Sequence, residues 1–246
     1  VDRAGKKMGV TMSHRFDQDK TTLRRQLRSG DHGPVDYLVG RFTCNCRSYG
    51  SWGAEWKYTM DNPTLIGGAI HHLDILADLA DSKCETLWAK TWNPPWSDFE
   101  GNCQSMVMMT FENGSHAFYE GTKANAAGLN GWGTEYFRAE CRDSTLILDA
   151  RELEQLSYDP DNEADYSGNK EGTGETIPLD EQDKWANTWL VEQFVDWLDG
   201  GEPMPTNVED NLQSVAMIFG AIESSETNQP VHVQEFIEDA RDRVDI

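Results

Sequence analysis

Apolar residues recur every three or four positions in several stretches of the chain, the spacing that gathers them on one face of an α-helix. The pattern predicts helices over residues 19–28, 66–80, 185–198 and 207–227. Glycines at Gly30, Gly200 and Gly201 follow two of these stretches, where they can end a helix. In the last helix we expect these side chains to face the core: Val215, Ile218, Phe219 and Ile222.

Shorter stretches alternate between apolar and polar residues or are rich in β-branched residues, as half-buried strands are. The predicted strands cover residues 10–16, 35–47, 86–92, 105–111, 116–122, 135–141, 145–149 and 153–158. Between two of them, Glu112-Asn113-Gly114 is a hairpin signal. Strands that follow one another with short turns form a meander, so we expect an antiparallel sheet. Residues 48–63 and 159–175 are predicted loops.

This order of elements predicts the α+β class, with one open, predominantly antiparallel sheet and helices packed on one of its faces. The opposite face then has to be covered by water or by another protein. The sheet carries Met106, Met108, Phe118 and Tyr136 among its apolar residues. We therefore expect the chain to form a homo-oligomer through this open face.

The charge of the chain limits its partners. Its 246 residues include 43 Asp and Glu against 21 Lys and Arg, a net charge of −22, which repels nucleic acid and anionic membranes. Nine Trp, nine Phe and seven Tyr argue against disorder, because a chain this aromatic can bury a core. Acidic residues spread along the chain, with few lysines, suit a halophilic protein kept soluble in high salt; an ordinary acidic cytosolic protein is the alternative.

Five cysteines at irregular spacing do not make a disulfide framework and indicate free thiols in the reducing cytoplasm. The chain has no run of 18 apolar residues that would predict a membrane span, and its start lacks the apolar core of a signal peptide. Residues 1–7 have the pattern of a helix already under way, so we expect the chain to be part of a longer protein.

The most informative segment places two histidines and a carboxylate at the start of an apolar helical run. His71, His72 and Asp74 follow the glycine pair Gly67 and Gly68. Histidine exchanges protons near neutral pH, and glycines let a cofactor or substrate approach the backbone. The segment therefore predicts an acid–base site, with a structural histidine satisfied by the backbone as the alternative.

Other motifs are weaker. Residues 128–133 are glycine-rich but do not join a strand to a helix, so they fail the test for a dinucleotide cradle. Cys44 and Cys46 share a strand face, which favours two buried core cysteines over a metal site. His71 and Asp74 could ligate a metal, but a third ligand is not evident, and we predict no metal centre.

The segment from Gly67 to Asp74 resembles the glycine-, histidine- and aspartate-bearing segment of the Gfo/Idh/MocA oxidoreductases, the family of glucose–fructose oxidoreductase and inositol dehydrogenase. The resemblance covers nearly the whole chain in order and spacing. Its further pieces are Ser13-His14-Arg15-Phe16, Leu27 to Pro34, Trp56-Lys57, Gly201 to Asp210 and Ile222 to Ser225.

The resemblance implies the substrate-binding half of such an enzyme, with a fold like the C-terminal domains of dihydrodipicolinate reductase and glyceraldehyde-3-phosphate dehydrogenase. Residues 1–16 would be the last helix and strand of a largely missing Rossmann domain, and residues 17–246 the substrate-binding and oligomerisation domain. That missing domain would bind most of the NAD or NADP. The substrate would be a small polyol, namely a sugar, a sugar derivative or a cyclitol, oxidised at a CH–OH group.

The resemblance also assigns roles to single residues. His71 is in register with the histidine that takes the hydroxyl proton. Gly67 and Gly68 would contact the cofactor. The candidates for substrate binding are Arg15, Trp56, Lys57 and His72. Gly67 stands where the family often has an aspartate, four residues before His71, and this departure bears on the proton relay.

Three functions compete on this basis. The first is the C-terminal domain of an NAD(P)-dependent sugar or cyclitol oxidoreductase, inactive as a fragment. The second is a non-catalytic binding or regulatory member of the family, motivated by Gly67 in place of the acid. The third is an unrelated α+β interaction module.

Overall fold

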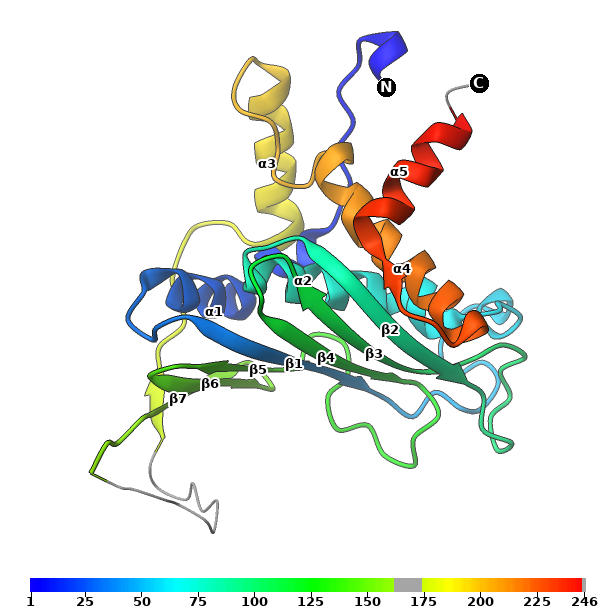
Figure 1. The fold of residues 1–246 in the computed structure, drawn as a ribbon, viewed down its shortest axis with the longest axis horizontal. Helices are drawn as coiled ribbons and strands as arrows, with labels where there is room; N and C mark the ends of the chain where they lie inside the picture. The colour runs from blue at the N-terminus through cyan, green and yellow to red at the C-terminus, as the bar shows by residue number, and fades with distance from the viewer. Residues whose placement is uncertain (162–173, 245–246) are drawn as a thin grey trace.

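A nine-stranded sheet with helices on one side forms the frame of the molecule (Figure 1). The computed structural model describes residues 1–161 and 174–244. The strands are β1 (Val35–Thr43), β2 (Cys84–Trp92), β3 (Gln104–Phe111), β4 (His116–Thr122), β5 (Tyr136–Cys141), β6 (Ser144–Asp149), β7 (Glu152–Ser157), β8 (Glu175–Ile177) and β9 (Val231–His232). Six of the predicted strands are thereby confirmed, and the seventh, residues 35–47, is confirmed as far as Thr43.

The strand order is β8-β7-β6-β5-β1-β4-β3-β2-β9. All neighbours are antiparallel except β1 and β4, which pair in parallel with Tyr37 opposite His116. The expectation of a purely antiparallel meander is therefore wrong at this point, although the sheet is predominantly antiparallel as predicted. A parallel pair needs a long crossover, and the segment that carries α2, β2 and β3 between β1 and β4 supplies it.

The helices are α1 (Gln18–Ser29), α2 (Ile70–Ala80), α3 (Ala186–Leu198), α4 (Val208–Thr227) and α5 (Val233–Val244). The first ends at Gly30 with a φ of 85°, a left-handed conformation that glycine adopts without strain. The fourth begins at Asn207, whose side-chain oxygen accepts hydrogen bonds from the backbone amides of Glu209 and Asp210. The four helices predicted from periodicity are thus confirmed.

Helices α1, α2 and α4 lie against one face of the sheet, while α3 and α5 project away from it (Figure 1). The main core lies between sheet and helices and contains Leu73, Ile75 and Leu76 of α2. In α4, Ile218 is buried as expected, but Val215 and Phe219 are 36% and 50% exposed. Those two expectations are wrong because small residues, among them Ala221 and Ser224, form the face of α4 that packs on β2.

The amino-terminal residues depart from the sequence prediction. Residues 1–7 contain a 3-10 turn at Asp2–Ala4 instead of a helix end, and Ser13–Phe16 is a second 3-10 turn instead of part of a strand. Gly9 forms only an isolated bridge to Asn207, so this segment has no neighbouring strand to extend. The sequence analysis also missed β8, β9 and α5, and residues 162–173 of the predicted loop lie outside the described residues.

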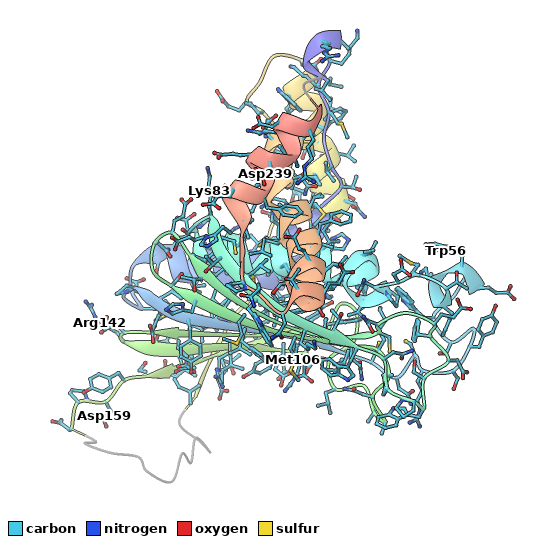
Figure 2. All side chains as sticks on the ribbon, turned by 45° about the vertical axis from the view of Figure 1, so that its right-hand side comes forward. Trp56, Lys83, Met106, Arg142, Asp159 and Asp239 are labelled. Atoms are coloured by element: carbon cyan, nitrogen blue, oxygen red, sulfur yellow. The ribbon has the colours of Figure 1, made fainter. Side chains whose placement is uncertain are left out.

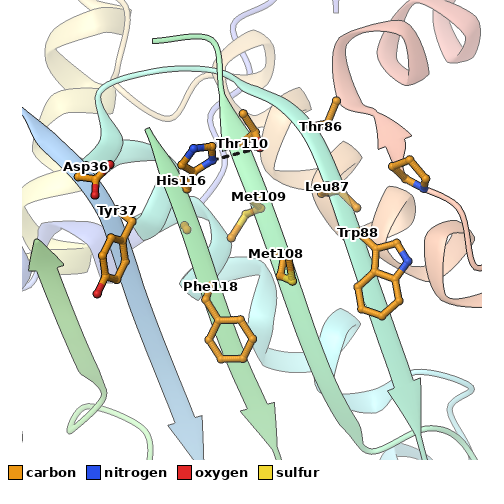
Figure 3. A pocket seen from close by; sticks show the side chains of 12 residues that line it. Asp36, Tyr37, Thr86, Leu87, Trp88, Met108, Met109, Thr110, His116 and Phe118 are labelled. Carbon is orange, nitrogen blue, oxygen red and sulfur yellow. Dashed lines mark hydrogen bonds between the residues drawn. The ribbon is translucent and has the colours of Figure 1, made fainter. Parts of the chain in front are cut away.

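The open face of the sheet exposes apolar side chains, as the sequence predicts. Met106, Met108 and Phe118 are 40%, 55% and 36% exposed. Figure 3 shows Phe118 and Met108 beside Tyr37 and Trp88 across four neighbouring strands, lining an open hollow of about 440 Å³. In the described residues no helix is long and apolar enough to cross a membrane.

The contact between α2 and β1 provides a test of the core. Leu76 is fully buried, and a methyl group built on Gly40 of β1 would come within 3.1 Å of its Cδ1 atom. We expect Leu76→Ala to lower the free energy of unfolding by about 2–5 kcal/mol, through lost burial and the cavity left behind. Urea denaturation measures this. Leu129→Ala is the control, since Leu129 is 67% exposed and its loss should change stability by less than about 0.5 kcal/mol.

Candidate active site

His71 occupies the first turn of α2, directly after one turn of π-helix over Leu65–Ala69. Its Nδ1 atom is buried and has no hydrogen-bond partner among the described residues. The alternative of a histidine satisfied by the backbone therefore does not hold at this atom. π-helical turns are frequent at functional sites, because they shift the side chains that follow out of the regular helical register.

Because Gly67 and Gly68 have no side chains, other side chains of the protein can approach this turn. A Cβ atom on Gly67 would lie 2.5 Å from the Trp52 indole, so that indole fills the space a side chain would occupy. A Cβ on Gly68 would lie 3.9 Å from Nζ of Lys123, an ordinary contact. The structure thus supplies a packing reason for glycine at position 67, and the cofactor contact expected there stays a prediction.

Aromatic rings surround the His71 imidazole. Trp132 meets it edge to face with ring centroids 5.3 Å apart, and His14 meets it edge to face at 6.0 Å. Trp132 also stacks on His14, with centroids 4.7 Å apart and planes 7° from parallel. Because Trp132 is itself 56% exposed, it forms the boundary between the histidines and solvent.

Beneath these rings lies the buried carboxylate of Glu135. Its Oε1 atom lies 2.9 Å from Nε2 of His14 and 3.5 Å from Nε2 of His72, and its Oε2 atom accepts a hydrogen bond from Nζ of Lys20 at 3.1 Å. Nδ1 of His72 hydrogen-bonds the Tyr119 hydroxyl at 2.7 Å. One carboxylate therefore holds two histidines and a lysine from three separate elements in a fixed arrangement.

The histidines of this cluster have opposite protonation tendencies. Burial lowers the pKa of His14, but hydrogen bonds to Asp17 and Glu135 outweigh it and raise that pKa to about 9. Burial, followed by repulsion from His14, lowers the pKa of His71 to about 4. Although burial opposes ionisation of Glu135, its hydrogen bond from His14 and its close contact with His72 hold its pKa well below the usual range. At neutral pH the site therefore pairs a cationic His14 with a neutral His71.

Arg15 and Asp74 belong to a second, adjoining cluster. The Arg15 guanidinium donates to Asp210 at 2.7 Å and to the Pro205 carbonyl at 2.7 Å, and it lies 3.6 Å from Asp74. Asp74 also accepts a hydrogen bond from Ser214. Burial raises the pKa of Asp74 to about 6, although Arg15 and Ser214 act in the opposite direction. This cluster joins α2, α4 and the segment before α1. The Arg15 guanidinium is therefore already bound by groups of this chain.

The structure does not bring all predicted substrate-binding residues together. Trp56 is 61% exposed and lies at the edge of the molecule in Figure 2, on a 3-10 turn over Glu55–Tyr58. Lys57 extends from the same turn over the Trp52 ring, with Nζ 4.5 Å from the ring centroid. Trp52 in turn lies against Gly67, whereas His72 is fully buried in the Glu135 cluster.

The described residues contain one group with the donor set for a metal ion, namely His14, His72 and Glu135. The proposed pair of ligands, His71 and Asp74, is not in it, because Asp74 faces Arg15 and Ser214. The donors are already paired within the protein: His14 contacts Asp17 at 2.6 Å, and Glu135 accepts from Lys20. The group is therefore neutralised internally and does not depend on a metal for charge balance.

Sequence reasoning assigned no role to Glu135, Trp132 or Lys20. Glu135 lies 121 positions from His14 and 63 from His72, so no local spacing connects them. The one available signal is the glycine-flanked Trp132, which is unusual in an otherwise polar loop.

Comparison with known proteins finds a matching family model and a protein of similar sequence. The model of a family described as "Oxidoreductase family, C-terminal alpha/beta domain" matches residues 24–233. The "Uncharacterized protein y4oX" of Sinorhizobium fredii (strain NBRC 101917 / NGR234) is 48% identical over 241 residues, 98% of this chain and 66% of that protein. The chain therefore spans slightly less than two thirds of the length of this relative.

Solved structures share the fold. An oxidoreductase from Agrobacterium radiobacter in complex with NAD+, L-tartaric acid and magnesium matches with a TM-score of 0.76 and 16% identity, over 95% of this chain and 67% of that one. The aldose-aldose oxidoreductase from Caulobacter crescentus, complexed with glycerol, gives 0.74 and 15%, over 94% and 65%. The WlbA dehydrogenase from Bordetella pertussis, in complex with NADH and UDP-GlcNAcA, gives 0.69 and 16%, over 94% and 65%.

The raised pKa of His14 predicts a pH dependence of stability. A group whose folded pKa lies above its unfolded value stabilises the protein below the unfolded pKa and loses that effect as pH rises through the folded pKa. We expect the His14 contribution to fall by about 3 kcal/mol between pH 6.5 and about 9. Urea denaturation of wild type and His14→Gln across this range measures it, since the difference cancels other titrating groups.

The control for this measurement is His116→Gln, because His116 is exposed on β4. That variant should keep the wild-type pH profile. Equal pH profiles for wild type and His14→Gln would show that the ion pairs of His14 with Asp17 and Glu135 do not stabilise the fold.

Proposed function

We propose a function from the premise that this chain belongs to the Gfo/Idh/MocA family of oxidoreductases, whose C-terminal domain model matches residues 24–233. We propose that the chain is the substrate-binding domain of an NAD(P)-dependent enzyme that oxidises or reduces a CH–OH group of a sugar, a sugar derivative or a cyclitol. Family membership excludes the unrelated α+β interaction module. We propose that residues 1–16 are a remnant of a dinucleotide-binding domain and that residues 17–246 form the substrate-binding and oligomerisation domain.

One observation carries the proposal: the buried, unpartnered Nδ1 of His71 on a neutral imidazole. A general base needs a free lone pair at the pH at which it works. Burial, followed by repulsion from the protonated His14, lowers the pKa of His71 and keeps it neutral. His71 is thus ready to accept a hydroxyl proton from a substrate that enters beside Trp132.

The surrounding residues hold this base in place. Glu135 and Lys20 fix His14, and the stacked Trp132 covers both imidazoles. A proton taken by His71 raises the positive charge near His14, and the carboxylates of Asp17 and Glu135 stabilise that charge. These carboxylates thereby offset part of the cost of placing a proton on His71, without any movement of the buried cluster.

NAD or NADP, when bound, supplies the hydride acceptor or donor for this chemistry. The described residues fit only part of such a cofactor: the π-turn exposes backbone at Gly67, but Gly68 is buried and Trp52 fills the space next to Gly67. We propose that these glycines contact the nicotinamide end and that a part of the protein outside this chain binds the rest. The chain alone is then expected to be inactive.

The substrate residues divide into two groups. Trp56 and Lys57 are accessible and could contact a polyol by stacking and hydrogen bonding, whereas Arg15 and His72 are buried and would act by positioning Asp74 and Glu135. Two structural neighbours are a WlbA dehydrogenase in complex with UDP-GlcNAcA and an aldose-aldose oxidoreductase complexed with glycerol, which supports a hydroxyl-rich small molecule as substrate.

We further propose a cytoplasmic location, because all five cysteines are free. The net charge of −22 disfavours nucleic acid as a partner and favours solubility at high salt.

The proposed base is tested in the full-length protein. We expect His71→Gln to lower kcat for a polyol substrate by 10²–10⁴-fold, the range in which general bases contribute, with a smaller effect on KM. NAD(P) reduction followed by absorbance measures this, and His116→Gln is the control with unchanged kcat. Wild-type kcat in His71→Gln would contradict the role of His71.

A second function has support from a specific observation. The Trp52 indole covers Gly67, so an acid at this position, common in the family, has no space here. This favours a binding or regulatory member without turnover. Full-length protein that binds NAD(P) but oxidises no compound of a broad polyol panel would support that function.

We also propose that the open sheet face joins two copies of the chain. The exposed Met106, Met108 and Phe118 form an apolar surface, and a second copy with the same surface would remove them from water. We expect Met108→Glu combined with Phe118→Glu to shift the mass measured by light scattering toward the monomer. Leu198→Glu, at the exposed end of α3, is the control and should keep the wild-type mass.

A further inference from the structure

Two cysteine thiols meet beyond the end of β1, on a segment that is hydrogen-bonded to the segment of the buried Lys123. The Sγ atoms of Cys44 and Cys46 are 3.4 Å apart and share a hydrogen bond. Both side chains are partly exposed, so the sequence expectation of two buried core cysteines is wrong. An external reagent can therefore reach the pair.

The backbone holds these thiols against Lys123. The amide of Cys44 donates to the Thr122 carbonyl at 2.9 Å, and the amide of Cys46 donates to the Lys123 carbonyl at 2.7 Å. Beyond the parallel pairing of β1 with β4, an isolated antiparallel bridge joins Asn45 to Ala124. These bonds keep the two cysteines and Lys123 on neighbouring segments.

Lys123 is 1% exposed, and no carboxylate of the described residues lies within ion-pair distance of it. Its Nζ atom lies 3.5 Å from the centroid of the Trp52 ring and 5.0 Å from that of Phe42. Burial lowers the pKa of Lys123 to about 8, while the charges of Cys44 and Cys46 act in the opposite direction. A buried ammonium without a carboxylate needs an anionic neighbour, and a thiolate can provide it.

The pKa values of the two thiols are shifted in opposite directions. The hydrogen bond shared with Cys44 lowers the pKa of Cys46, against burial, and the positive charge of Lys123 lowers it further. Cys44 keeps the remaining proton, and its pKa is raised. The pair therefore holds a thiolate next to a thiol, which is the arrangement of an attacking and a resolving cysteine.

We propose that Cys44 and Cys46, with their sulfur atoms 3.4 Å apart, form a peroxide-responsive dithiol, in which the Cys46 thiolate is oxidised by a hydroperoxide and Cys44 then closes a disulfide. In the first step the Cys46 sulfur attacks the terminal oxygen of the hydroperoxide and the O–O bond breaks. The other oxygen leaves as an alcohol, or as water, after taking one proton from solvent. In the second step the Cys44 thiol attacks the sulfenic acid, forms the S–S bond and releases water.

The dithiol is connected to the proposed active site through two side chains. Trp52 lies between Lys123 and Gly67, and Lys123 also approaches Gly68. Formation of the disulfide removes a negative charge that favours the charged form of Lys123. The dithiol itself does not depend on the proposed dehydrogenase activity.

Mass spectrometry of the intact protein treated with hydrogen peroxide tests the proposal. Trypsin releases residues 42–47 as one peptide that holds Cys44 and Cys46, while Cys84, Cys103 and Cys141 fall in separate peptides. We expect this peptide to lose two hydrogen atoms, to resist alkylation and to recover after reduction. Cys44→Ser should instead accumulate sulfenic acid at Cys46, and Cys141→Ser, on the partly exposed end of β5, should behave as wild type.

The rate of alkylation by iodoacetamide tests the role of Lys123 separately. At pH 7 we expect Cys46 to react on the order of tenfold or more faster than Cys141, whose pKa is raised to about 11 by burial. In Lys123→Met the pH profile of Cys46 should move upward. If that variant does not fold, the alkylation rates of the wild-type protein still test the proposal. Equal rates for Cys46 and Cys141 overturn it. Peroxide-induced disulfides that do not join Cys44 to Cys46 overturn it as well.

Discussion

The arrangement of this site depends on one buried carboxylate. Glu135 draws together His14, His72 and Lys20, which come from the segment before α1, from α2 and from α1 itself. A buried charge is tolerated only when it is paired, and removal of one partner typically costs about 3–5 kcal/mol. The same constraint that stabilises the junction of these elements therefore positions the two histidine rings next to His71 and Trp132.

This arrangement separates the protonation states of neighbouring histidines. His14 has two carboxylates in contact and stays charged, while His71 is buried without a partner for Nδ1 and stays neutral. Two imidazoles 6.0 Å apart thus take different roles because of their surroundings. In the function that we propose, this asymmetry has a chemical use, since a neutral base is required to accept a hydroxyl proton.

Much of the fold could be predicted from the sequence, because periodicity is local. The spacing of Leu73, Leu76 and Ala80 was sufficient to place α2, and Glu112-Asn113-Gly114 marked the hairpin between β3 and β4. The failures have physical causes. The parallel pairing of β1 with β4 joins segments far apart in the chain, and Val215 and Phe219 of α4 satisfy a helical pattern without facing the core.

The sequence by itself determined four of the five α-helices of the described residues, most strands, the open apolar sheet face and the register of His71 within α2, because each depends on residues close together in the chain. Only the tertiary structure decided which groups surround His71. It brought Glu135 and Trp132 to His14, turned Arg15 toward Asp74 and Asp210, and placed Trp52 over Gly67. These contacts join residues from separate elements, so their charges and shapes become specific only when the sheet and its helices have packed.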